Sequence, residues 1–170
     1  MALSLFKSEI MNIIIAIVIL LAYTIALCIK GGGVPSSLSA SVFDLPMSKR
    51  WIWTVVLAAV CFLCVPTYVC KAGDNTQFLA FIAIAALAFV GAAPLVEDKS
   101  DLAYKVHCVT AVICAVCSQL VLVLNMPLLL LSWVPFVAAG FIVGWGKWCT
   151  MTFWAEMVCF VSTFAFCMIY

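Results

Sequence analysis

Charge is what this sequence has least of. Among 170 residues only eight are Lys or Arg and seven are Asp or Glu, which makes 9% charged against 68% hydrophobic. No segment is polar enough to form a soluble domain beside the apolar runs. The composition therefore excludes a soluble globular protein, and we expect no nucleic-acid partner.

Histidine is equally scarce, because His107 is the only one. One histidine cannot provide bis-histidine haem ligation, and no Cys-x-x-Cys pair lies in a polar loop where zinc ligands are found. Ten cysteines are present, and the pairs Cys61/Cys64 and Cys114/Cys117 have redox-motif spacing. Both pairs lie in the middle of apolar runs, where thiol exchange lacks access. We therefore expect no metal, no cofactor and no disulfide, with the cysteines acting as small apolar side chains.

Long apolar runs fill the rest of the chain. A stretch of about 20 apolar residues spans a hydrocarbon core of roughly 30 Å, and a backbone in lipid must be helical to satisfy its own hydrogen bonds. The first run is followed by Lys30-Gly31-Gly32-Gly33 and not by a small-residue cleavage site, so we expect it to be retained. The sequence predicts an all-α fold, a single six-transmembrane-helix bundle over residues 1–170 embedded in the lipid bilayer. The predicted spans are residues 10–29, 51–70, 78–96, 102–124, 126–145 and 148–170.

The basic residues predict the orientation of this bundle. Six of the eight lie in or beside the connections that follow the first, third and fifth runs, namely Lys30, Lys49, Arg50, Lys99, Lys105 and Lys147. Because cytoplasmic loops carry the excess of Lys and Arg, loops 30–50, 97–101 and 146–147 are predicted to be cytoplasmic. Both termini are then outside, and the expected location is the cell membrane, the inner membrane of a bacterium.

Polar side chains gather on the predicted cytoplasmic side. At 1.5 Å per residue, His107 lies about 7 Å into the fourth span and Glu156 about 12 Å into the sixth. Ionisable groups at such depth normally face the bundle interior, so we expect these two to meet there. Ser118 shares the helical face of His107, and Asp101 and Lys105 lie just before it in the sequence. The alternative is that these small and polar faces serve only close helix packing.

The first connection is unusually long and mixes apolar with polar residues. Pro35 follows three glycines, and serines such as Ser37 and Ser39 can cap a short helix at the membrane interface. We expect loop 30–50 to fold back over the cytoplasmic mouth of the bundle.

A set of short motifs between residues 30 and 120 resembles a known pattern. These motifs are Ser37-Leu38-Ser39-Ala40, Arg50 before an aromatic-rich span, Asn75 in the next turn, Pro94 and His107. Together they resemble uncharacterised six-span bacterial membrane proteins of the DUF998 and Frag1-like kind. The resemblance implies a six-helix fold and a site near Ser37, Ser39 and His107, without implying a reaction.

Three functions remain open. The favoured one is binding or permeation of a small ligand, lipid or ion, with His107 and Glu156 as the titrating groups. The second is a non-catalytic scaffold or subunit that holds another membrane protein or a second copy of this chain. The third and least favoured is an intramembrane lipid-modifying hydrolase, in which His107 would act as general base near a serine, helped by Asp101 or Asp98.

Overall fold

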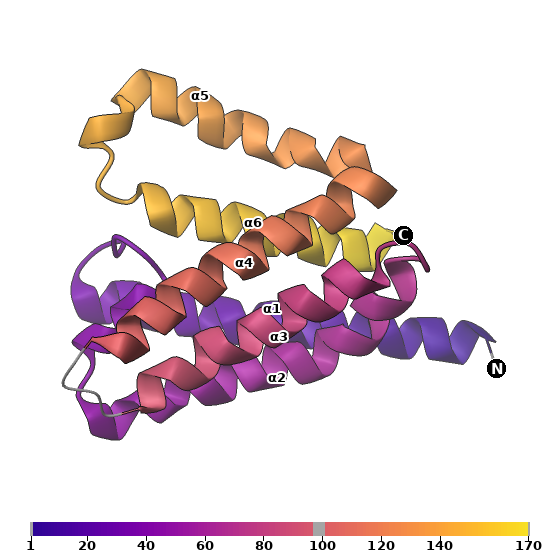
Figure 1. The fold of residues 1–170 in the computed structure, drawn as a ribbon, viewed down its shortest axis with the longest axis horizontal. Helices are drawn as coiled ribbons and strands as arrows, with labels where there is room; N and C mark the ends of the chain where they lie inside the picture. Colours follow the sequence, from indigo (N-terminus) through magenta and orange to yellow (C-terminus); the bar gives the residue numbers. More distant parts are fainter. Residues whose placement is uncertain (1, 97–100, 170) are drawn as a thin grey trace.

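A computed structural model describes residues 2–96 and 101–169. Within these residues every regular element is helical, which confirms the all-α prediction. Figure 1 shows the six α-helices, which are α1 (Ala2–Gly31), α2 (Met47–Lys71), α3 (Gln77–Ala92), α4 (Leu102–Asn125), α5 (Trp133–Val143) and α6 (Met151–Ile169). Four short 3-10 segments join them, η1 (Ala40–Asp44), η2 (Ala93–Leu95), η3 (Pro127–Ser132) and η4 (Trp145–Lys147).

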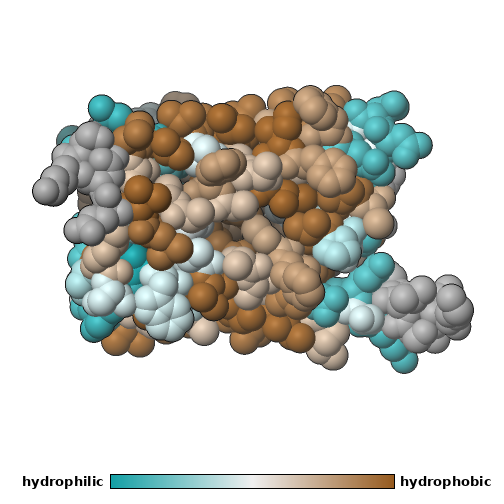
Figure 2. All heavy atoms as spheres, turned by 60° about the horizontal axis from the view of Figure 1, so that its bottom comes forward, coloured by the Kyte–Doolittle hydropathy of each residue, from teal (hydrophilic) through white to brown (hydrophobic). Residues whose placement is uncertain are grey.

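Five of these helices are long and apolar enough to cross a membrane. They are α1 from Lys7, α2, α3 together with η2, α4 and α6, with lengths of 19 to 25 residues. On the face shown in Figure 2, apolar side chains cover the middle of the molecule and hydrophilic ones gather at its two ends. This distribution is the one expected of a membrane protein.

The fifth predicted span has a different form. Residues Pro127–Val143 make an apolar helical segment of 17 residues, and only the last 11 are α-helical. Pro135 has no backbone N–H and lies in the first turn of α5, where none is needed; its ring would clash with the carbonyl of Leu131 if the α-helix also included the preceding turn. The segment therefore begins as the 3-10 helix η3 and continues as α5. Directly after α5 the chain folds back so tightly that a Cβ at Gly140 would lie 2.4 Å from the Trp145 ring.

The helices run alternately in opposite directions (Figure 1). Both termini lie at one end of the bundle. The other end, called the loop end below, carries the first loop (residues 32–46) and the starts of α2, α4 and α6. α5 lies at the edge of the molecule, packed mainly on α6.

Small side chains bring the central helices close together. Ala80, Ala83 and Ala86 recur at every third residue of α3 and are buried against its neighbours. Such residues let helix backbones approach closely in a membrane, where packing replaces the hydrophobic effect as the driving force. At the opposite end from the first loop, the Lys71 ammonium donates a hydrogen bond of 2.8 Å to the Cys167 carbonyl. This cation therefore lies at the C-terminus of α6, where the helix dipole favours it.

Candidate functional site

The Glu156 carboxylate is the centre of a cluster at the loop end. Glu156 lies on the second turn of α6, and its two oxygens accept hydrogen bonds from four groups of the first loop. The Ser37 hydroxyl donates at 3.0 Å, the Leu38 N–H at 2.6 Å and the Ser39 N–H at 3.4 Å, and the Ser39 hydroxyl donates as well. A carboxylate has about four lone-pair sites, so this arrangement fills them. Glu156 therefore fastens the first loop to α6.

The same part of the loop completes the start of α6. The first N–H groups of a helix have no partner within it. The Phe153 N–H donates to the Ser36 carbonyl at 3.0 Å, and the Ser37 hydroxyl accepts the Ala40 N–H at 3.1 Å at the start of η1. Leu38 and Val42 are fully buried, so the loop forms part of the core. A buried loop needs such partners for its backbone polar groups.

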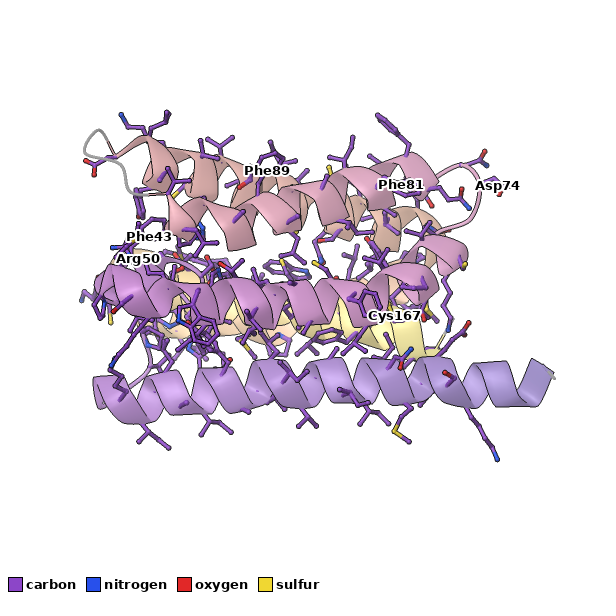
Figure 3. The ribbon with its side chains drawn as sticks, turned by 90° about the horizontal axis from the view of Figure 1, so that it is seen from below. Phe43, Arg50, Asp74, Phe81, Phe89 and Cys167 are labelled. Atoms are coloured by element: carbon purple, nitrogen blue, oxygen red, sulfur yellow. The ribbon has the colours of Figure 1, made fainter. Side chains whose placement is uncertain are left out.

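Arg50 holds the other half of the loop. Its Nε donates to the Leu45 carbonyl at 3.1 Å and one terminal nitrogen donates to the Phe43 carbonyl at 2.9 Å. The guanidinium also lies 5.3 Å from the centre of the Phe43 ring, within the range of a cation–π contact. Figure 3 shows Phe43 and Arg50 together at the loop end, far from Asp74 in the turn between α2 and α3.

His107 lies in a second cluster, built around the Val90 carbonyl. In a regular helix this carbonyl would accept the N–H of residue 94, but that residue is Pro94, which has none. The His107 Nδ1 lies 3.0 Å from the Val90 oxygen, and the Trp53 Nε1–H donates to it at 3.3 Å. Because a carbonyl only accepts, Nδ1 carries the proton. The other ring nitrogen, Nε2, is buried without a hydrogen-bond partner in the described structure.

The two ionisable groups therefore occupy separate clusters joined by the first loop. Within the described residues, the hydrogen bonds of His107 and Glu156 go to different partners. Glu156 binds the start of the loop, whereas the Phe43 ring packs edge-on against the His107 ring at 5.1 Å. α6 begins at Met151 and not at residue 148, so Glu156 lies about 7 Å along its helix and not about 12 Å. His107 and Glu156 thus lie at similar depth on helices that pack together.

A cavity of 340 Å³ extends from the Glu156 cluster into the bundle. On α6 its wall runs from Thr152 to Phe164, twelve residues apart, which corresponds to about 18 Å. Polar groups lie at its loop end, where Ser39 and Glu156 form the wall, and apolar side chains and thiols line most of the rest. Val112 of α4 is part of the wall and is 63% exposed, so the cavity reaches the apolar outer surface of the bundle.

A polar cluster in the middle of the bundle was not predicted from the sequence. The Gln119 amide of α4 donates to the Ser162 hydroxyl of α6 at 3.2 Å, and the Gln119 carbonyl oxygen accepts the Trp133 indole N–H at 2.9 Å. This cluster ties α4, α5 and α6 together. The signal in the sequence was the amide side chain of Gln119 within a predicted span, because such side chains form hydrogen bonds between membrane helices.

The remaining predicted site residues are scattered. Ser118 is buried and lines the cavity, with its hydroxyl bonded to the Ala115 carbonyl at 3.0 Å. Asp101 and Lys105 are exposed at the start of α4, where the Lys105 N–H donates to the Asp101 carbonyl at 3.0 Å. Asp98 lies outside the described residues. The structure thus brings Ser37, Ser39 and Glu156 together and places the exposed pair elsewhere.

The cysteines are free thiols. All ten are unpaired, including the two Cys-x-x-Cys pairs. Four of them, Cys61, Cys64, Cys114 and Cys159, line the cavity. Among the described residues, no three His, Cys, Asp or Glu side chains are grouped so that they could hold a metal ion.

Comparisons of the chain with protein-family models, with curated proteins and with solved structures found no match. The resemblance to six-span bacterial membrane proteins therefore stays a prediction.

Proposed function

We propose that this membrane protein binds a lipid or lipid-like molecule, with its hydrocarbon chain in the cavity and its polar group at the Glu156 end. The observation that carries the proposal is the shape and polarity of the cavity. Its length of about 18 Å is close to half of a hydrocarbon core of roughly 30 Å, which is what one lipid tail spans. Its volume of 340 Å³ falls in the range of about 300–1,000 Å³ typical of small-molecule sites.

The polarity of the wall favours binding over permeation. A pathway for an ion or a polar solute needs polar groups along its length. Here the one charged group of the described wall, Glu156, lies at the loop end. Farther along the wall the polar groups are isolated hydroxyls such as those of Ser118 and Tyr68, separated by apolar side chains and thiols. An apolar chain entering beside Val112 from the bilayer would not need to leave an apolar environment.

A scaffold is the second candidate, and α5 supports it. In the segment of η3 and α5, Leu128, Phe141 and Ile142 are 73%, 75% and 85% exposed. A partner helix or a second copy of the chain could pack on this face in the membrane. The hydrolase alternative has less support, because the described structure gives His107 no hydrogen bond to Ser37 or Ser39.

Two exposed cysteines test the proposed orientation. Cys70 is in the last turn of α2, and Cys149 lies between η4 and α6 at the loop end. If the loop end is cytoplasmic, a membrane-impermeant maleimide added to spheroplasts should label Cys70, and Cys149 should react only after lysis. The single variants Cys70→Ser and Cys149→Ser assign the labelled site by mass spectrometry. Labelling of Cys149 in intact spheroplasts would reverse the orientation.

The cavity itself is tested by filling it. Ala115 lines the cavity from α4, and its neighbour Val116 is 52% exposed on the outer surface. Native mass spectrometry of the purified protein should detect a bound lipid, whose occupancy falls about tenfold, or 1.4 kcal/mol, in Ala115→Phe. Val116→Phe adds the same ring facing the bilayer and should leave occupancy unchanged. Equal lipid occupancy in both variants would count against the cavity as the binding site, provided both melt within a few degrees of the wild type.

A further inference from the structure

The hydrogen-bond donors of the first loop that surround Glu156 are already engaged. The Ser39 hydroxyl lines the cavity and gives its hydrogen to Glu156. The N–H groups of Leu38 and Ser39 and the Ser37 hydroxyl also point at this carboxylate. Farther along the wall, the Ser118 hydroxyl donates to the Ala115 carbonyl. With their hydrogens engaged, the hydroxyl oxygens of Ser39 and Ser118 have only lone pairs to offer toward the cavity, so they act there as hydrogen-bond acceptors.

The charge on the described wall of the cavity is negative. Among the described residues that line the cavity, Glu156 is the only one that carries a charge. Four donors converge on its two oxygens, and this arrangement suits a carboxylate, whose two oxygens only accept hydrogen bonds. Arg50, a basic residue of the same end, is turned toward the carbonyls of Phe43 and Leu45.

We infer that the ligand of this cavity is a single-chain lipid whose polar group is a hydrogen-bond donor and is not anionic, an alkyl amine or an alcohol. This inference rests on the proposed function and adds the selectivity of the site. An ammonium or hydroxyl group at this end meets acceptors and a negative charge. A carboxylate or phosphate meets the same negative charge, and the described wall offers it no cation, only the neutral hydroxyl of Thr152. Like charges at short range in a low dielectric repel strongly.

Three probes of equal chain length test the inference: dodecylamine, dodecanol and dodecanoate. Binding is measured at pH 7 by native mass spectrometry from phosphatidylcholine nanodiscs, with Ala115→Phe as the blank for partitioning into the bilayer. Dodecylamine should bind at least about tenfold more tightly than dodecanoate, with dodecanol in between. Dodecanoate binding as tightly as dodecylamine, with both blocked in Ala115→Phe, would overturn the selectivity and leave the lipid site standing. No binding of any probe above the blank would overturn both.

A charge-inserting variant avoids the risk of unfolding the loop. Thr152 is exposed and lies on the cavity wall beside the polar end, so Thr152→Lys adds a cation there without touching the partners of Glu156. The added cation lies one helical turn before Glu156 and offsets its charge, so the preference for dodecylamine over dodecanoate should be lost. Trp154→Lys is the control, because Trp154 is 44% exposed and is not part of the wall. An unchanged preference for dodecylamine in Thr152→Lys would contradict the inference.

Discussion

Replacing Glu156 by alanine is expected to destabilise the protein by about 3 kcal/mol and to detach the first loop from α6. The change leaves the donors of Ser37, Leu38 and Ser39 without their common acceptor. A buried donor left unsatisfied costs about 1–3 kcal/mol, and hydrogen bonds to a charged group are the stronger ones. Thermal unfolding in detergent should show a fall of roughly 10 °C. Hydrogen exchange of the Leu38 and Ser39 amides should become fast.

Two further variants make this result specific. Asp74 is an exposed carboxylate in the turn between α2 and α3 (Figure 3), and Asp74→Ala should change stability by less than about 0.5 kcal/mol. Glu156→Gln keeps one acceptor oxygen but turns an NH2 group toward the loop donors, so its effect should be intermediate. The role assigned to Glu156 is wrong if Glu156→Ala melts like Asp74→Ala and the loop amides stay protected.

Hydropathy predicts most of this fold because a backbone that spans a lipid bilayer must satisfy its own hydrogen bonds, and a helix does so within one segment. The runs around α1 to α4 and α6 are long and apolar, and the structure makes each of them a helix of spanning length. The run of residues 126–145 is equally apolar, yet hydropathy does not register its prolines. Pro127 begins η3, and Pro135 in the first turn of α5 disfavours an α-helix that includes the turn before it, so the segment begins as a 3-10 helix while its surface stays apolar.

The site could be predicted only in part. Glu156 stands out in the sequence, since a carboxylate within an apolar span needs a partner. The sequence does not say which partner, because Ser37 and Ser39 lie more than a hundred residues away and their approach depends on how the first loop folds. The cavity is also invisible to sequence patterns, since it depends on side chains of α2, α4 and α6 failing to fill the space between them.

Replacing His107 by alanine is expected to lower the free energy of unfolding by about 3 kcal/mol, which is the second large effect. His107 is 1% exposed, and its ring fills space beside Phe43 as well as donating to the Val90 carbonyl. His107→Phe separates the two contributions, because phenylalanine keeps the ring and loses the donor. It should cost only about 1 kcal/mol, since Trp53 still donates to the same oxygen. Chemical or thermal unfolding of the two variants in detergent measures both values.

His107 and Trp53 bond the Val90 carbonyl because Pro94 has no N–H to donate to it. A double-mutant cycle tests this explanation. Pro94→Ala returns an N–H to residue 94, which can bond Val90 if α3 continues by one more turn. The destabilisation caused by His107→Phe should then be smaller by about 0.5–1 kcal/mol in the Pro94→Ala background. This coupling is measured from the unfolding curves of the wild type, the two single variants and the double variant. Trp53→Phe should show coupling of the same sign with Pro94→Ala, because Trp53 and His107 donate to one oxygen. Strictly additive effects of Pro94→Ala with both substitutions would mean that His107 and Trp53 do not substitute for the missing helical hydrogen bond.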